Sequence, residues 1–545
     1  MTTSLTSGLR DRAFRWIADD PDDDSRVELQ NILARAMGGE PGATKELADR
    51  MAGPLEFGTA GLRGPVRAGP NGMNVAVVTR TTAGVAAWLT AQGHPGGVVV
   101  VGRDARHGSE AFAKAAAEVL TAAGFAVKVL PGPLPTPVLA FAVLELGAVA
   151  GIQITASHNP PADNGYKLYD ASGGQIVPPS DGQIERAIEA ALPAISVPRE
   201  PGAEVLGDEL RDAYLAKVAL LPRGPEREVK VAATALHGVG ADTLRAAFER
   251  AGFGDLHVVA EQATPDPDFP TVAFPNPEEP GATDLLLALA SEVDADLAIA
   301  LDPDADRCAL GVRKRDGSWR MLRGDETGVL LGWHVLSTVD KEDPLVATTI
   351  VSSSMLGEIA KEFGARYAET LTGFKWLVRA GEGLVFAYEE ALGLCVNPGF
   401  VRDKDGISAA VFAAGLAASL RAAGRGPLDV LDELAVKHGV HVTDQVSLRV
   451  TDLSVRERLM AGLRAAPPAS LGGTDVTTED LLPDADVLRL TGEGLRVVIR
   501  PSGTEPKLKA YLQVKEPVSG DLAEAHTAAD ARLAALRADI ESRLA

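Results

Sequence analysis

The chain has 545 residues, of which 46% are hydrophobic and only 5% aromatic, which is enough for several aliphatic cores and for roughly three to four domains. Its formal net charge of −22 argues against an unspecific electrostatic grip on nucleic acid or on an anionic membrane. The two cysteines, Cys308 and Cys395, cannot build a disulfide framework. No stretch resembles a signal peptide or a bilayer-spanning segment, so we expect a cytoplasmic protein with two free thiols.

The first predicted element in chain order is a helical extension over about the first 45 residues. Three later segments, 96–130, 227–259 and 344–370, share one order: an apolar run, a polar loop, a helical stretch, a glycine and a second apolar run. This order predicts a βαβ crossover in each segment, with parallel strands and a left-handed glycine near each helix end. Recurrence at such a long spacing indicates repeated domains and not a solenoid.

The last hundred residues differ, because short strand-like runs come before an acidic, alanine-rich helix. They predict a smaller α+β domain with a mixed or antiparallel sheet. The predicted fold class is therefore α/β, with three similar mixed α/β domains that have mainly parallel sheets and a smaller C-terminal α+β domain. The predicted domains are 1–220, 221–323, 324–445 and 446–545.

The stretch "ITASHNPPADNGYK" (154–167) places polar groups directly after the apolar run "VAGIQI". One interpretation is an ordinary polar turn, because Asn-Pro and Asn-Gly are common turn signals. The alternative interpretation is that Ser157 is a reactive residue, with His158 and Lys167 in the same stretch of sequence.

The loop "ALDPDADRCAL" (300–310) sets three carboxylates at alternate positions after another apolar run. A solvated acidic turn is the plain alternative. An EF-hand is excluded because its sixth and twelfth positions would fall on Arg307 and Arg313. Three hard oxygen ligands with open positions are typical of Mg²⁺ bound beside a phosphoryl group. The predicted metal ligands are Asp302, Asp304 and Asp306.

Several other polar loops are weaker signals when taken singly. "GTAGLRG" (58–64) is a glycine-rich loop with one cation, and "RPSGTEPKLK" (500–509) combines a guanidinium, hydroxyls and flexible backbone in a pattern that favours an anion site over an ordinary turn. Adjacent carboxylates and cations also follow apolar runs between 370 and 408. The candidates are Arg63, Lys375, Glu389, Glu390, Arg402, Lys404, Arg500, Ser502, Gly503 and Thr504.

Ligands of open α/β sheets bind outside the carboxyl ends of strands. The loops at 58–64, 155–167, 302–307, 372–376 and 389–404 are all candidate strand exits. Several domains can then offer loops to one central cleft. A hydroxyl nucleophile, a divalent cation and scattered cations and carboxylates fit phosphoryl transfer on a phosphorylated polyol.

These motifs together resemble the α-D-phosphohexomutase superfamily of phosphoglucomutases and phosphomannomutases. "TASHNP" resembles its phosphoserine loop, "DPDADR" its metal loop, the Glu389 region its sugar loop and "RPSGTEPK" its phosphate loop. "FGTAGLRG", "TLTGFKW" and "FVRDKDG" are most similar to the phosphoglucomutase-2 and phosphopentomutase-like branch. The resemblance covers about residue 45 to the end and implies four domains around a deep cleft.

The resemblance also implies roles for these residues. Ser157 would be the phosphoserine, whose phosphoryl oxygen completes the Mg²⁺ site, and a sugar bisphosphate would be the bound intermediate and activator. Lys167 and Lys404 are candidates for general acid–base work, since a lysine near other cations can have a lowered pKa. The residues expected around the reacting phosphoryl group are His158, Arg63 and Arg307. Those expected on the substrate are Lys375, Glu389, Glu390, Arg402, Arg500, Ser502, Gly503 and Thr504.

The implied activity is a phosphosugar mutase that moves a phosphoryl group between C1 and the distal hydroxyl, with glucose first and ribose, deoxyribose or mannose as alternatives. The familiar sugar loop reads Glu-x-Ser, whereas this chain has Ala391 at the third position, which questions the sugar and not the reaction. A phosphatase and a non-catalytic phosphosugar-binding protein are the rival classes. The expected partners are small phosphosugars, with no nucleic acid and no membrane, in a monomer or homodimer.

Overall fold

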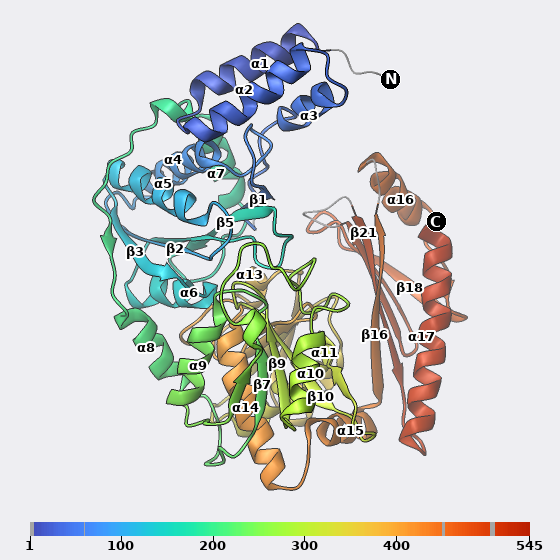
Figure 1. Cartoon of the computed structure of the whole chain (residues 1–545). Helices are drawn as coiled ribbons and strands as arrows, with labels where there is room; N and C mark the ends of the chain where they lie inside the picture. The colour runs from blue at the N-terminus through green and yellow to red at the C-terminus, as the bar shows by residue number, and fades with distance from the viewer. Residues whose placement is uncertain (1–4, 59, 450–452, 502–506, 545) are drawn as a thin grey trace. The chain divides into compact units, whose positions relative to one another are not determined.

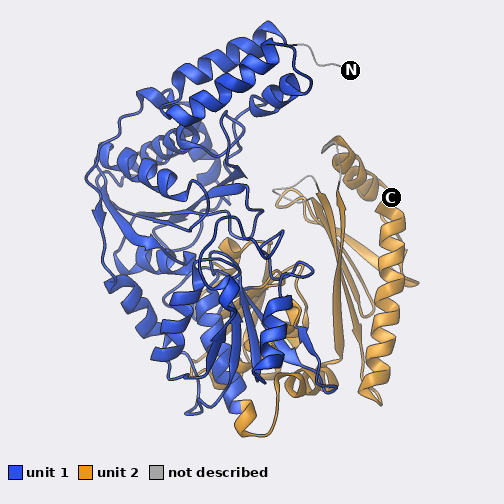
Figure 2. Ribbon diagram, viewed as in Figure 1, with its two compact units in different colours: residues 1–321, 393–419 blue, residues 322–392, 420–545 orange. Residues whose placement is uncertain are grey.

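The computed structural model describes residues 5–58, 60–449, 453–501 and 507–544. It divides into two compact units, coloured separately in Figure 2. Unit 1 holds residues 1–321 and 393–419, and unit 2 holds residues 322–392 and 420–545. Each unit is described by itself.

Unit 1 begins with a small helical layer (Figure 1). The Thr6 and Asp22 side chains cap its first two helices by accepting backbone N–H bonds. Leu29, Leu33 and Leu47 are buried in a core of this layer. The helices are α1 (Ser7–Asp19), α2 (Asp23–Met37) and α3 (Ala43–Arg50).

The first sheet of unit 1 has the strand order β1-β5-β4-β2-β3-β6. Its parallel centre includes the crossover predicted at 96–130, which forms β2 (Val98–Arg103), α5 (Ser109–Ala122) and β3 (Ala126–Pro133). Gly124 follows α5 with φ 86°, as the sequence predicts. The remaining elements are β1 (Leu62–Pro65), α4 (Val75–Ala91), α6 (Thr136–Glu145), β4 (Ala150–Ile154), β5 (Asp163–Asp170), α7 (Ser180–Glu189), β6 (Glu204–Val205) and α8 (Glu209–Val218).

The second sheet of unit 1 has the order β11-β10-β9-β7-β8. The crossover predicted at 227–259 is β7 (Val231–Thr234), α9 (Gly240–Arg250) and β8 (Leu256–Val258), with parallel strands. The buried strand β9 (Leu297–Leu301) runs parallel to β7, and β10 (Cys308–Arg313) returns antiparallel to β9. The loop at 302–307 is therefore a hairpin connection at a strand exit. The remaining elements of unit 1 are α10 (Asp284–Glu292), β11 (Trp319–Met321), β15 (Gly393–Cys395) and α14 (Gly406–Ala422).

Unit 2 has a parallel layer with β12 between β13 and β14. The crossover predicted at 344–370 forms β12 (Leu345–Thr349), α12 (Met355–Glu362) and β13 (Arg366–Thr370). All three predicted crossovers are thus confirmed. The other elements are α11 (Gly324–Thr338), α13 (Phe374–Leu377), β14 (Leu384–Glu389) and α15 (Pro427–His438).

The C-terminal part of unit 2 is an antiparallel sheet of order β16-β21-β20-β19-β18-β17, with α17 packed along β16 and β21. Apolar side chains of α17, such as Leu533, Leu536 and Ile540, complete its core. The predicted α+β character of this part is confirmed. Its elements are β16 (Val440–Arg449), α16 (Leu453–Ala465), β17 (Ser470–Leu471), β18 (Thr474–Asp480), β19 (Leu488–Gly492), β20 (Leu495–Pro501), β21 (Lys507–Glu516) and α17 (Leu522–Leu544).

Two composition-based expectations can be compared with these elements. Both cysteines are free and buried, as expected. Among the described helices, none alone is long and apolar enough to cross a membrane, although α14 and α15 pass the length and composition test when taken as a pair.

Candidate active site

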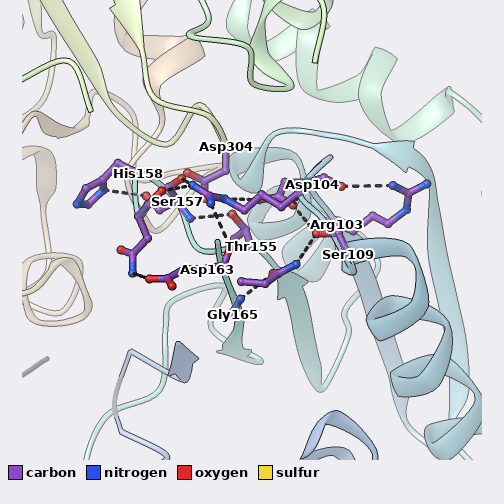
Figure 3. Close-up of polar contacts among 12 residues, drawn as sticks. Arg103, Asp104, Ser109, Thr155, Ser157, His158, Asp163, Gly165 and Asp304 are labelled. Carbon is purple, nitrogen blue, oxygen red and sulfur yellow. Dashed lines mark hydrogen bonds and ion pairs between the residues drawn. The ribbon is translucent and has the colours of Figure 1, made fainter. Parts of the chain in front are cut away.

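Ser157 lies three residues beyond the end of β4, at the point where the chain turns back (Figure 3). It is only 1% exposed, and its φ of 53° is left-handed, which is uncommon for a residue other than glycine and costs about 1–3 kcal/mol. Its N–H donates to Thr155 Oγ1 at 2.9 Å. Its Oγ donates to Asp302 Oδ2 at 2.8 Å and lies 3.2 Å from His158 Nδ1. Because the hydroxyl has one proton, His158 Nδ1–H is then the donor in the second contact.

Arg63 and Lys167 lie inside strands, and not in the loops that the sequence indicates. The chain returns from the Ser157 turn directly into β5, which pairs antiparallel with β4 so that Lys167 lies opposite Gln153. β1 then pairs with β5 and sets Arg63 opposite Gly165. The 58–64 loop is therefore the entry to β1 and not a strand exit, which corrects the prediction. Gly61 makes this close pairing possible, since a Cβ there would lie 1.8 Å from the Tyr166 carbonyl oxygen.

The three aspartates of the 302–306 loop form a fully buried carboxylate cluster. One carboxylate oxygen from each of the three lies within 4.8 Å of the other two. Asp304 Oδ1 and Asp306 Oδ1 accept no hydrogen bond from any described residue. Buried carboxylate oxygens without a donor are the donor set that a hard divalent cation needs. The residues present therefore fit a Mg²⁺ ion.

The cluster is balanced by two buried lysines. Lys167 Nζ donates to Asp304 Oδ2 at 2.6 Å and to Asp306 Oδ2 at 2.7 Å. Lys404 Nζ lies 3.3 Å from Asp306 Oδ2 and 3.4 Å from Asp403 Oδ1. Burial by itself lowers the pKa of Lys167, but its two carboxylate partners outweigh burial and raise that pKa above its ordinary value. The expected lowering is therefore wrong for Lys167, because its nearest charges are anions.

The aspartates differ from one another in their ionisation. Burial and the neighbouring carboxylates raise the pKa of Asp302 well above its usual value. Burial also opposes ionisation of Asp306, but Lys167, Lys404 and Arg307 outweigh burial and lower its pKa. The ionised form of Asp302 is therefore the one that an added cation would stabilise.

Three further predicted residues bring positive charge or a neutral ring to the same site. Arg63 Nη1 donates to Asn159 Oδ1 at 3.3 Å, and its buried Nε has no hydrogen-bond partner among the described residues. Arg307 N–H donates to Asp302 Oδ1 at 3.0 Å. Burial, followed by the charges of Arg307 and Arg63, holds the pKa of His158 well below its usual value, so the ring is neutral at pH 7. A buried guanidinium with unused donor capacity is suited to an added oxyanion.

Lys375, Glu389 and Glu390 lie in unit 2 near the ends of β13 and β14 of one parallel sheet: Lys375 is in α13 after β13, Glu389 is the last residue of β14, and Glu390 follows it. Glu390 N–H donates to Ser352 Oγ at 3.1 Å, and Ser352 Oγ donates to Glu390 Oε2 at 3.0 Å. Ser352 follows β12 of the same sheet. The carboxyl ends of all three strands therefore bring these groups to one edge of this sheet.

The phosphate-loop candidates are only partly described. Arg500 lies on β20 opposite Lys509 of β21. Ser502, Gly503 and Thr504 lie outside the described residues. Arg402 is partly buried in unit 1, two residues before Lys404.

Two buried side chains that contact the site are not among the candidates that the sequence predicts. Thr136, the first residue of α6, donates from Oγ1 to Asp304 Oδ2 at 2.6 Å, and its N–H donates to Asp304 O at 2.9 Å. Arg106 binds the backbone of the Ser157 loop. Arg106 belongs to "GRDAR" after the run "GGVVVV", and this strand exit was a usable signal.

Family models for phosphoglucomutase/phosphomannomutase match four consecutive parts of the chain. Alpha/beta/alpha domains I, II and III match residues 54–194, 212–317 and 323–436, and the C-terminal domain matches residues 449–541. The chain belongs to the phosphoglucomutase/phosphomannomutase family. It is therefore a mutase, an isomerase that transfers phosphoryl groups in carbohydrate metabolism.

Relatives of this mutase have different names. A "Probable phosphomannomutase" of Haemophilus influenzae is 43% identical over 463 residues, which cover 83% of this chain and 95% of the relative. The human "Phosphopentomutase" is 34% identical over 573 residues, covering 93% and 92%. The crystal structure of a putative phosphomannomutase from Thermus thermophilus shares the fold, with a TM-score of 0.68 at 24% identity, and covers 88% of this chain and 99% of its own.

Proposed function

We propose that this mutase works through a phosphoserine at Ser157 and moves a phosphoryl group between C1 and the distal hydroxyl of a sugar. The observation that carries the proposal is the Ser157 hydroxyl, buried and 2.8 Å from an acidic triad, with Arg63, His158 and Arg307 on the same site. A cation among these carboxylates would neutralise the negative charge that otherwise opposes a phosphoryl group on the neighbouring hydroxyl. This arrangement favours phosphoryl transfer over a polar turn.

Asp302, Asp304 and Asp306 would hold Mg²⁺ together with an oxygen on Ser157. When bound, the metal would neutralise charge on the phosphoryl group as it transfers. The buried oxygens without donors on Asp304 and Asp306 support this assignment.

The remaining groups would bind the phosphoryl group and move protons. The P–O bond to Ser157 breaks as a sugar hydroxyl oxygen bonds to phosphorus. The hydroxyl proton passes to a base on the protein, and Ser157 Oγ leaves as a hydroxyl by taking a proton from an acid on the protein. Reversal with the second phosphate of a bound sugar bisphosphate restores the phosphoserine. Lys167 is held as an ammonium by two carboxylates and would act as a proton donor, while Lys404 is the second acid–base candidate. Arg63 and Arg307 would contact the phosphoryl oxygens.

Glu389 would accept hydrogen bonds from sugar hydroxyls, and Arg500, with Ser502, Gly503 and Thr504, would bind the phosphate that does not react. Because Ala391 lacks the hydroxyl of the usual Glu-x-Ser loop, we expect relaxed sugar choice, with glucose 1-phosphate first and ribose 1-phosphate second. The relatives named for mannose and pentose phosphates fit a family whose sugar varies. We also propose the four-domain division at 220, 323 and 445.

Ser157→Ala tests the mechanism. The variant should fold with little change in thermal stability, because alanine keeps the Cβ and the same backbone conformation and loses one hydrogen bond but no core packing. Mutase turnover should fall by at least about 10³-fold, because the covalent intermediate is lost. Intact mass after incubation with glucose 1,6-bisphosphate should show one phosphoryl group on the wild type and none on Ser157→Ala.

Thr155→Ser is the matched control, because it keeps the hydroxyl that receives Ser157 N–H. It should keep most of the activity. Near-wild-type turnover by folded Ser157→Ala would refute the phosphoserine mechanism. Steady release of inorganic phosphate in place of isomerised sugar phosphate would assign the chain to the phosphatases.

Ala391→Ser tests the substrate assignment. A serine would restore one hydrogen bond worth about 0.5–1.5 kcal/mol. The ratio of kcat/KM for glucose 1-phosphate over ribose 1-phosphate should rise several-fold. An unchanged or lowered ratio would place sugar specificity elsewhere, for example at Lys375 or Arg402.

A further inference from the structure

A single buried side chain, that of Arg106, binds the backbone of the Ser157 loop at four points. Its Nη2 donates to the carbonyl oxygens of Ser157 at 2.7 Å and Asn159 at 2.6 Å. Its Nη1 donates to those of Pro160 at 2.8 Å and Asp163 at 3.1 Å. The rigid, planar fork of a guanidinium fixes the relative positions of the acceptors that it joins. One guanidinium therefore fixes the relative positions of four carbonyl groups of the loop.

Arg106 is itself held on its other sides. Its N–H donates to Asp104 Oδ1 at 2.9 Å, and its Nε lies 3.5 Å from Asp104 Oδ2. Ser109 Oγ donates to the same Asp104 Oδ1 at 2.5 Å (Figure 3). The ring of Phe269, from the segment between β8 and α10, lies 5.0 Å from the guanidinium carbon. These contacts leave the buried guanidinium little freedom to follow a moving loop.

The conformation of the Ser157 loop requires such a restraint for two reasons. The left-handed φ of 53° at Ser157 is strained, so an unrestrained loop would relax away from the conformation that aims Oγ at Asp302. A phosphoserine would also add about −1.5 to −2 charge to a loop that is already beside three carboxylates. The Arg106 guanidinium, which donates to the Ser157 carbonyl oxygen, would both restrain the backbone and offset the added negative charge.

We propose that Arg106 is a positioning residue for the phosphoryl-transfer step, because its four carbonyl contacts hold Ser157 in the reactive conformation. This inference rests on the proposed role of Ser157 as the phosphoserine. Arg106 touches the backbone of the loop, and it acts on the reacting oxygen through Ser157.

Arg106→Lys tests the inference, because a lysine keeps the charge and loses the planar fork. The expected result is a kcat about 10- to 100-fold lower with a KM within about threefold of the wild type, since a displacement near 1 Å at a reacting group costs up to about 10²-fold. Arg103→Lys is the matched control. Arg103 is the last residue of β2, three residues before Arg106. Its side chain donates to Asp104 O and Glu110 and not to the carbonyl oxygens that Arg106 binds. Its kcat should stay within about twofold of the wild type.

The decisive readout is the phosphoserine itself, after incubation of full-length protein with glucose 1,6-bisphosphate. The rate of phosphoryl incorporation should fall in Arg106→Lys in proportion to kcat, and the phosphorus NMR resonance of the phosphoserine should shift or broaden. Arg103→Lys should match the wild type in both. A purely structural role would lower the folded fraction and leave the resonance and the rate per folded molecule unchanged, and that result would overturn the proposal.

Two further measurements cover the cases in which Arg106→Lys does not fold or the wild type takes up no phosphoryl group. If Arg106→Lys does not fold, Phe269→Leu removes the ring over the guanidinium and keeps an apolar side chain, and it should lower kcat several-fold with the same spectral change. Unchanged kcat and spectrum in Phe269→Leu would then count against Arg106. If the wild type itself takes up no phosphoryl group, the failure belongs to the phosphoserine assignment and not to Arg106.

Discussion

At the scale of single residues, the acidic loop is an unequal set of carboxyl groups. Asp304 accepts from Thr136 and Lys167 on one oxygen, while its other oxygen has no donor among the described residues. Asp302 has a raised pKa and accepts a hydrogen bond from the Ser157 hydroxyl. Substitution of one aspartate therefore changes a metal ligand and an ion pair together.

Asp304→Asn should lower both the apparent Mg²⁺ affinity and the turnover. The amide keeps the size of the carboxylate but loses the charge that attracts the metal and Lys167. Excess Mg²⁺ should restore part of the rate, which a titration of kcat against Mg²⁺ concentration measures. Activity of the wild type that survives EDTA unchanged would show that the three aspartates serve structure alone.

At the scale of elements, the end of β14 holds two adjacent carboxyl groups in different surroundings. Glu390 is tied to Ser352 after β12, and Thr349 Oγ1 donates to the same Oε2 at 3.3 Å. Burial, followed by the charges of Glu389 and Asp325, raises the pKa of Glu390 to about 7. Tyr511 of β21 also lies within electrostatic range of Glu390. Glu390 is thus a half-buried side chain that anchors the strand end, and Glu389 is the residue proposed to contact the sugar.

The raised pKa of Glu390 predicts a pH dependence of stability. Because the folded state binds the proton more tightly than the unfolded state, its contribution to stability is fully present below about pH 4.5 and is lost as pH rises through about 7. The full effect is at most about 3 kcal/mol, and partial exposure of the side chain reduces it. Glu390→Gln cannot ionise, so its Tm relative to the wild type should rise between pH 5 and pH 8.

The exposed Glu382 of the same unit gives the control for this measurement. Glu382→Gln removes one charge without removing a buried one, so its Tm difference from the wild type should stay flat over the same pH range. A flat difference for Glu390→Gln as well would show that Glu390 is ionised throughout.

At the scale of the whole molecule, the acidic triad and its lysines lie within unit 1, including Lys404, which returns to unit 1 with residues 393–419. A ligand that binds only the folded form of one unit stabilises that unit by mass action, by about 2.7 kcal/mol at one hundred times its Kd. Chains of this size commonly unfold in more than one step.

Calorimetric unfolding should therefore show a transition that Mg²⁺ moves to higher temperature and another that it moves less. Leu47→Ala, in the core of the N-terminal helices, should lower the Mg²⁺-sensitive transition, because deletion of a buried leucine costs about 2–5 kcal/mol. Leu512→Ala, in the core of the C-terminal sheet, should lower the other. A single transition that responds equally to Mg²⁺ and to both variants would contradict this expectation.

The sequence by itself determined the repeated crossovers and the sites of chemistry that follow them. Alternation of apolar runs, helices and glycines is a local property, and a helix that follows one strand can pack back on the sheet only as a right-handed crossover. Ser157 and the acidic loop were visible for the same reason, because each stands directly after a buried strand.

Only the tertiary structure decided which side chains meet. Ser157 Oγ lies 2.8 Å from Asp302 Oδ2 although 145 residues separate them, and because β4 and β9 belong to different sheets, the packing of these sheets within unit 1 sets this contact. Arg63 and Lys167 look like loop residues in the sequence, but antiparallel returns of the chain place them in β1 and β5. The position of Arg106 after a buried strand is visible in the sequence, but its contacts are not, because its partners are carbonyl oxygens, which every residue carries. Local sequence pattern indicates burial and chain direction, whereas long-range pairing of strands and the packing of one sheet against another decide the geometry of the site.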